Sequence, residues 1–170
     1  MVGPIGYQFI FAAMSASIQF LPSLSPETPY FESVVQLLAE ALESPPTDLR
    51  ADLLYQQQRQ PLQVWLALGP SGGVVGAKLG YERQPGHYYS WLGGVAAAAR
   101  GQGLGAALMR QQHQWCRQQG YRRIRTQTFN RWRAMLLLNL RHGFDIVGTV
   151  QGARGLTLVL EKDLTGLERA

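Results

Sequence analysis

The sequence has a single cysteine, Cys116, among its 170 residues. One cysteine cannot form an internal disulfide, and it also excludes a cysteine-rich metal site. No apolar run approaches the roughly 20 residues that a membrane-spanning helix needs. The apolar stretch FIFAAM near the N-terminus has no Lys or Arg before it, so the positive segment of a signal peptide is missing. We therefore expect a cytoplasmic protein without a metal, in which Cys116 is a small core or surface residue rather than a nucleophile.

Positive charge is absent from residues 1–49, which hold five carboxylates and no Lys or Arg. The rest of the chain carries all 16 basic residues, and the whole chain has a net charge of +5. Arg far outnumbers Lys, and the planar fork of Arg suits phosphate. A basic body can bind nucleic acid or a small polyvalent anion, or it can simply be a solvated surface. No RNA-binding aromatic motif or helix-turn-helix spacing accompanies the charge, so we expect no nucleic-acid partner.

The length is that of one domain, residues 1–170, of which residues 1–15 form a candidate N-terminal extension. Hydrophobic periodicity and turn residues predict the order β-α-α-β-β-β-α-β-α-β-β. The strands are expected within 17–22 and at 62–69, 74–82, 87–96, 122–129, 144–150 and 155–164, and the helices at 26–43, 48–58, 104–119 and 131–142. Ser25 is the expected cap of the first helix, with Pro26 at its first position, and Thr47 or Asp48 is the expected cap of the second.

A glycine-rich segment, Arg100-Gly-Gln-Gly-Leu-Gly105, joins the strand at 87–96 to the helix at 104–119. Each glycine costs a helix about 1 kcal/mol relative to alanine. Three glycines at the start of a helix therefore indicate that backbone without side chains is needed here. Free amides at a helix N-terminus bind phosphate, and glycine lets a phosphate touch the backbone. The Lys-Ser/Thr of a P-loop and the further units of a Rossmann fold are both missing. The unit over 87–129 is a crossover, so its two strands are expected to be parallel neighbours.

The spacing Arg100-x-x-Gly103-x-Gly105 resembles the (Gln/Arg)-x-x-Gly-x-(Gly/Ala) signature of the GNAT family of N-acetyltransferases. Upstream, GGV at 93–95 stands at the place of the family's bulged strand, and downstream TFNRWRAMLLLNLRHGFDIVG is similar to its Asn…Gly-Phe segment. The resemblance implies an α+β fold with a mixed, mostly antiparallel sheet of six to seven strands and about four flanking helices. In this fold one splayed parallel pair of strands binds acetyl-CoA.

The resemblance also implies the chemistry, in which an acceptor amine attacks the thioester of acetyl-CoA directly. The signature loop would hold the pyrophosphate, the bulged strand would hold the pantetheine arm, and a backbone amide near Val95 would bind the oxyanion. The cofactor-binding residues implied are Gly94, Val95, Ala96, Arg100, Gly101, Gln102, Gly103, Leu104, Gly105, Asn130 and Asn139.

One position departs from the family pattern. Many members place a tyrosine four residues before the Gly-Phe pair, where it acts as the acid for the CoA sulfur, but here the residue is Asn139. An amide donates no proton at a useful pKa, although it can hydrogen-bond the sulfur. We therefore expect Asn139 to take part at the catalytic centre while the thiolate leaves without an acid, because the pKa of a thiol is low compared with that of an amine. Asn130 either contacts the cofactor or caps the following helix.

The general base is assigned first to Glu82, at the end of the strand at 74–82, with pairing to Arg83 in a turn as the alternative. His87 and His113 are expected to be exposed, and His142 to lie at a helix C-terminus, where the dipole favours a cation. The acidic N-terminal segment would lie over the acceptor and favour a cationic amine. Aromatic residues around the cleft either hold a cation over a ring or belong to the core.

These observations predict an acetyl-CoA-dependent N-acetyltransferase acting on the primary amine of a small molecule or peptide. The alternative is a noncatalytic acyl-CoA-binding or regulatory module on the same fold, which Asn139 favours. We expect no membrane partner, and a homodimer stays open.

Overall fold

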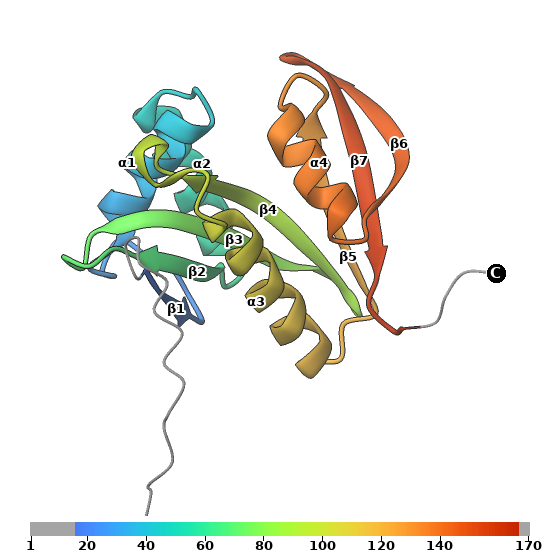
Figure 1. Cartoon of the computed structure of the whole chain (residues 1–170), viewed down its shortest axis with the longest axis horizontal. Helices are drawn as coiled ribbons and strands as arrows, with labels where there is room; N and C mark the ends of the chain where they lie inside the picture. Colours follow the sequence, from blue (N-terminus) through green and yellow to red (C-terminus); the bar gives the residue numbers. More distant parts are fainter. Residues whose placement is uncertain (1–15, 167–170) are drawn as a thin grey trace, which may run out of the picture.

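The computed structural model describes residues 16–166, so the predicted extension, residues 1–15, lies outside the described residues. The elements follow one another in the predicted order (Figure 1). They are β1 (Ser17–Leu21), α1 (Phe31–Ala41), α2 (Pro46–Arg59), β2 (Gln63–Leu68), β3 (Val74–Gln84), β4 (His87–Val95), the 3₁₀ turn η1 (Ala97–Ala99), α3 (Leu104–Gln118), β5 (Arg123–Phe129), α4 (Arg133–Arg141), β6 (Asp145–Gly152) and β7 (Gly155–Asp163).

The seven strands form one sheet in the order β1-β2-β3-β4-β5-β7-β6. All neighbouring pairs are antiparallel except β4 and β5, which are parallel. The α3 crossover between β4 and β5 accounts for this exception, because parallel neighbours need a crossover connection. The predicted fold class is confirmed.

Helices cover both faces of the sheet, as the alternating side chains of β2 illustrate. Val64 and Leu66 are buried with α1 and α2 in one core. Trp65 and Ala67 point to the other face and are buried with α3. Side chains alternate between faces along a strand, so each of these strands serves two cores.

The predicted caps of the first two helices are wrong. α1 begins at Phe31 with Tyr30 as its N-cap, and Ser25 instead accepts a turn hydrogen bond from the amide of Thr28. Pro29 disfavours helical backbone at the residue before it, which explains the later start. α2 begins at Pro46 without a side-chain cap. Among the helices of residues 16–166, none is long and apolar enough to cross a membrane.

The parallel pair is short. β4 and β5 are paired only between residues 87–89 and 123–125. Beyond that point β4 stays with β3 as far as Val95, while β5 stays with β7 as far as Phe129. The two strands therefore diverge, and in Figure 1 α3 and α4 lie beside the opening.

Candidate active site

The divergence of β4 and β5 leaves a cleft of about 1010 Å³ between them. Ligand pockets in proteins measure about 300–1,000 Å³, so the cleft has room for a ligand of cofactor size. β3, β4 and β5 form its middle, the ends of α1 and α2 lie at one side, and the glycine loop and α4 lie at the other.

The glycine loop has the form of an anion site. Gly101 and Gly103 have φ angles of 77° and 78°, a backbone conformation that glycine adopts readily. Gly103 is the N-cap of α3, and no side chain caps this helix, so its first amides are available to a ligand. A Cβ at either glycine would meet no atom within 4 Å. The space above the loop is therefore open to a phosphate.

The Arg100 side chain connects this loop to the end of β4 through a hydrogen bond. Its Nε donates a hydrogen bond of 3.1 Å to the carbonyl oxygen of Val95. Both residues line the cleft, and the Arg100 side chain is exposed. Arg100 can thus order the loop while its remaining N–H groups face an anion.

The two glycines of the β4 pair face different neighbours on the two faces of the sheet. A Cβ at Gly94 would lie 2.5 Å from the Cβ of Ala41, so glycine permits the end of α1 to approach β4. A Cβ at Gly93 would lie 3.7 Å from the Nζ of Lys78 on the opposite face. The register between β3 and β4 shifts beside this pair, as expected for a bulged strand.

The structure places most of the predicted cofactor residues around the cleft. The residues that line it are Gly94, Val95, Arg100, Gly101, Gly103, Leu104 and Gly105, whereas Ala96, Gln102, Asn130 and Asn139 do not line it. Ala96 instead donates its amide to the carbonyl of Val75. Asn130 accepts a hydrogen bond of 2.8 Å from Arg133, and the N-cap of α4 is Trp132 rather than Asn130.

Asn139 lies in α4 with only 2% of its surface exposed. Its backbone carbonyl accepts hydrogen bonds from the amides of His142 and Phe144, where the helix ends. Its neighbours Leu138 and Arg141 line the cleft. The geometry thus brings Asn139 to the wall behind the cleft, and its catalytic role stays a prediction.

Three carboxylates, Glu40, Glu43 and Asp52, line the cleft where α1 and α2 meet it. All three are exposed, so they contribute a negative electrostatic potential to this side of the cleft rather than a buried contact. Tyr89 and Trp91 line the same region, and the rings of both pack on Tyr81 at centroid distances of 5.5 and 5.8 Å. This side of the cleft combines negative charge with aromatic surface.

Glu43 adopts an unusual backbone conformation. It is the only non-glycine residue with positive φ in residues 16–166, at 53°. The amide of Ser44 bonds to the carbonyl of Ala39, and that of Glu43 to Glu40, which is the Schellman ending of a helix that normally carries glycine. A side chain in this conformation costs about 1 kcal/mol. Strain of this kind is common at functional sites, and here it holds a carboxylate at the cleft.

Glu82, the residue predicted as the base, lies outside the cleft lining. Its carboxylate accepts a hydrogen bond of 2.8 Å from the hydroxyl of Tyr121. Glu82 is paired with Tyr88 of β4, and at Tyr88 the parallel strands β4 and β5 have not yet separated. The geometry therefore favours the carboxylates on α1 and α2 over Glu82.

Buried polar side chains gather on the face of the sheet that α3 and α4 cover. They are Lys78, Ser90, Gln112, His113, Thr126, Thr128 and Asn139. Four of them carry buried atoms without a hydrogen-bond partner: the hydroxyls of Ser90 and Thr128, the Gln112 amide and Nε2 of His113. Each unpaired buried group costs about 1–3 kcal/mol, so this number in one layer calls for a functional explanation.

Lys78 is the charged member of this set. It is 8% exposed and lines the cleft beside Gly93. Neither of the two salt bridges among residues 16–166 involves it. Burial lowers the pKa of Lys78 to about 8, because the charged form loses hydration. A desolvated lysine in a cleft is a candidate functional group.

Two predictions about α3 have different outcomes. His113, expected to be exposed, is 3% exposed, so that prediction is wrong: its ring lies 5.4 Å from that of Phe144 and beside Lys162 of β7. Cys116 is buried, as expected of a packing residue, and burial raises the pKa of its thiol. Sequence reasoning also missed Lys78, although a single charge inside the apolar strand VVGAKLGY was a readable signal.

Within residues 16–166 no group of three or more His, Cys, Asp or Glu side chains is placed to hold a metal ion.

Comparison with known proteins gives a consistent result. A family model described as the acetyltransferase (GNAT) family matches residues 31–144. Among curated proteins, no significant match is found.

Solved structures match over nearly the whole chain. The IAA acetyltransferase from Bacillus cereus is 21% identical with a TM-score of 0.67, and the match covers 88% of this chain and 99% of that one. A GNAT acetyltransferase from Elizabethkingia anophelis with acetyl-CoA bound is 18% identical with a TM-score of 0.64, covering 86% and 97%. An N-acetyltransferase from Staphylococcus aureus is 18% identical with a TM-score of 0.69, covering 88% and 99%. At these identities the likeness concerns the fold.

Proposed function

The chain belongs to the acetyltransferase (GNAT) family, whose co-substrate is acetyl-CoA, and from this premise we propose that its acceptor is a cationic primary amine. The observation that carries the proposal is the polarity of the cleft. One side is a glycine loop with open helix amides, and the other combines three carboxylates with aromatic rings.

The residues around the glycine loop fit the cofactor. The uncapped amides of α3 and the exposed Arg100 would hold the pyrophosphate, and the open space above Gly101 and Gly103 would receive it. The edge of β4 that faces the cleft after Tyr89 is free of pairing with β5. Its backbone groups near Val95 would hold the pantetheine arm and the thioester oxygen.

The carboxylates favour an acceptor with positive charge. Glu40, Glu43 and Asp52 would attract an ammonium to the cleft, and Tyr89 and Trp91 offer ring faces for cation–π contact. Small polyamines, aminoglycoside-like amines and peptide N-termini share this chemistry. We assign the proton-accepting role to Glu43, because its backbone holds it at the cleft at an energetic cost.

Lys78 would assist departure of the thiolate. In acetyl transfer the amine nitrogen bonds to the carbonyl carbon, the carbon–sulfur bond breaks, and the sulfur leaves with the electron pair. The amine proton passes to Glu43, and the Lys78 ammonium supplies a proton to the sulfur. A pKa of about 8 for Lys78 is close to that of an ordinary thiol, which suits general acid catalysis near neutral pH.

A thiol-release assay tests the proposal. The chain is mixed with acetyl-CoA and either spermidine, kanamycin or a peptide with a free N-terminus. Glycine and glutamate serve as controls, because their carboxylates offset the positive charge of the ammonium. We expect release with at least one of the cationic amines and a lower kcat/KM with both controls. Acetyl-CoA binding without thiol release from any amine would contradict the proposed reaction.

A further inference from the structure

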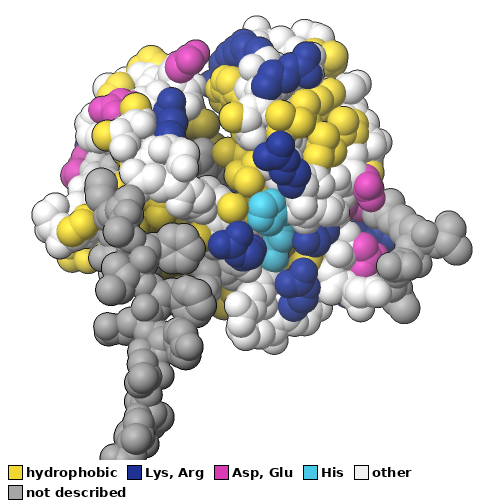
Figure 2. Space-filling model, in the orientation of Figure 1, with side chains coloured by type: hydrophobic (Ala, Val, Ile, Leu, Met, Phe, Trp, Pro, Cys, Tyr) yellow, Lys and Arg dark blue, Asp and Glu magenta, His cyan; other side chains and the backbone are white. Residues whose placement is uncertain are grey.

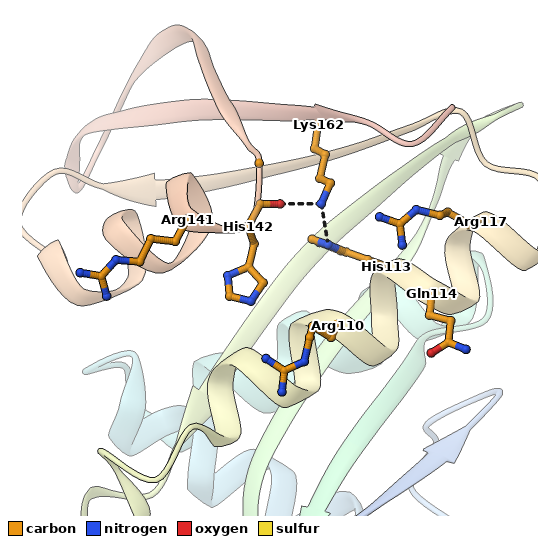
Figure 3. Close-up of a pocket in the computed structure, with 8 residues that line it drawn as sticks. Arg110, His113, Gln114, Arg117, Arg141, His142 and Lys162 are labelled. Atoms are coloured by element: carbon orange, nitrogen blue, oxygen red, sulfur yellow. Dashed lines mark hydrogen bonds between the residues drawn. The ribbon is translucent and has the colours of Figure 1, made fainter. Parts of the chain in front are cut away.

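A second, basic groove lies behind the cleft, between α3, the end of α4 and β7. It has a volume of about 600 Å³ and is lined by Arg110, His113, Gln114, Arg117, Arg141, His142, Gly143 and Lys162. Figure 3 shows Arg110, Arg117 and Lys162 around the two histidines. On the surface in Figure 2, dark blue cationic side chains surround a cyan histidine patch.

The groove has positive charge without a matching carboxylate. None of its lining residues is acidic, and the two salt bridges among residues 16–166 lie elsewhere. Lys162 donates a hydrogen bond to the carbonyl of His142. Burial and the neighbouring Arg117 lower the pKa of Lys162, so like charges face one another here.

His113 adds a buried donor that lacks a partner. Lys162 lies 3.4 Å from Nδ1 of His113, and an ammonium can only donate, so Nδ1 accepts and the proton of the neutral ring sits on Nε2. This Nε2 is buried and has no hydrogen-bond partner. Burial and the cations Lys162, Lys78 and Arg117 lower the pKa of His113 to about 2. The ring stays neutral mainly because burial disfavours its charged form, and the neighbouring cations add to this effect.

We propose that this groove binds a phosphate group. Arg110 and Arg117 lie two turns apart on α3, about 10 Å along the helix, and each offers a guanidinium fork that suits phosphate. Lys162 adds a third donor from β7, across the groove from α3. A dianion would offset the repulsion among these groups, which a neutral ligand would leave in place.

The phosphate can come from two sources. Arg141 lines both the groove and the acetyl-CoA cleft, so the 3′-phosphate of a bound acetyl-CoA is one source. A separate phosphorylated molecule is the other. The chemistry at Arg110, Arg117 and Lys162 is the same in both cases, and the proposal does not depend on the identity of the acceptor amine.

Calorimetry with inorganic pyrophosphate as the probe tests the site. The full chain is first saturated with dephospho-acetyl-CoA, so that the glycine loop is filled and the 3′-phosphate is missing. We expect pyrophosphate to bind, and Arg110→Gln and Arg117→Gln each to weaken binding about fivefold, since a partly exposed charge-assisted contact is worth about 1 kcal/mol. Arg83→Gln, at an exposed position on β3 outside the groove, is the matched control and should leave the Kd unchanged.

Replacing dephospho-acetyl-CoA with acetyl-CoA identifies the source. Loss of pyrophosphate binding with acetyl-CoA assigns the groove to the 3′-phosphate of the cofactor. Unchanged binding assigns it to a separate phosphorylated ligand. Absence of pyrophosphate binding, or equal Kd values for Arg110→Gln, Arg117→Gln and Arg83→Gln, would overturn the proposal.

Discussion

The two faces of the central sheet differ in what they bury. On the face covered by α1 and α2 the core consists of aliphatic and aromatic side chains. The face covered by α3 and α4 also has an apolar core, but it holds the buried lysine, the buried histidine and several hydroxyl and amide groups as well. Lys78 and Leu79, adjacent in β3, belong to opposite faces. The first face stabilises the fold, and the second gives up stability where the cleft needs polar groups.

The largest effects are expected when one buried residue is replaced on each face of β3. Lys78→Met should lower kcat about 100-fold, in the range of lost acid catalysis, and should raise the free energy of unfolding by about 1–4 kcal/mol because a buried unpaired charge is removed. The control Leu79→Ala should lower stability by about 2–5 kcal/mol with little change in kcat for the folded fraction. Urea unfolding and thiol release measure both. Full activity in Lys78→Met would remove Lys78 from the mechanism.

The pH profile sharpens the role of Lys78. With its pKa near 8, the ammonium is present below pH 8 and lost above it, so kcat should fall up to tenfold per pH unit on the alkaline side. Lys78→Met should lack this limb. In the unfolded chain the pKa of lysine is about 10.4, so unfolding takes up a proton between pH 8 and 10.4, and wild-type stability should rise over that range. A limb that persists in Lys78→Met belongs to another group.

A pair of glycine substitutions separates ligand contact from backbone strain. Gly103→Ala and Gly120→Ala both place a Cβ in open space at φ near 80°, so both should lose about 1–2 kcal/mol of stability. Gly103 lines the cleft and Gly120 does not. We expect a loss of at least tenfold in acetyl-CoA affinity for Gly103→Ala alone, measured by calorimetry. Equal affinities would separate the glycine loop from cofactor binding.

Glu43 is an exception on the α1 face of the sheet. Its positive φ lowers stability, but it holds a carboxylate at the cleft. Glu43→Gly should raise the unfolding free energy by about 1 kcal/mol, since glycine accepts the positive φ, and should raise the KM for a cationic amine about fivefold. Glu43→Gln keeps the strain but removes the charge and the proton acceptor. Its KM for the amine should rise and its kcat should fall about 100-fold, while stability stays unchanged. An unchanged KM in both variants would exclude Glu43 from acceptor binding.

The smallest effect is expected at Asn139. It is buried behind the cleft without lining it, so Asn139→Ala should change kcat and the KM for acetyl-CoA by about threefold or less, and should mainly lower stability through the lost packing. The alkaline limb of the pH profile should survive in this variant. Its loss in Asn139→Ala would mean that the acid operates through the Asn139 position and not through Lys78 alone.

Local sequence signals were sufficient to predict most of the fold. The spacing of apolar residues and the Pro and Gly breaks predicted the element order, and the crossover predicted the parallel pair, because these features act over a few residues. Helix starts were less accurate: Ser25 and Pro26 form a reasonable start by themselves, but Pro29 lies three residues further on and moves the start of α1 to Phe31.

The glycine loop could be located from the sequence because its form depends on consecutive backbone amides and on missing side chains. The partners of single polar residues could not, because they come from distant segments. Glu82 meets Tyr121, and His113 meets Lys162, 49 residues away. Which side of β3 faces the cleft, and hence that Lys78 is buried there without a salt bridge, depends on how β4 and β5 separate and how α3 packs across them. By itself the sequence determined the fold and the position of the glycine loop, through local backbone chemistry. The tertiary structure alone decided which charges lie in the cleft, because desolvation and charge contacts act through space rather than along the chain.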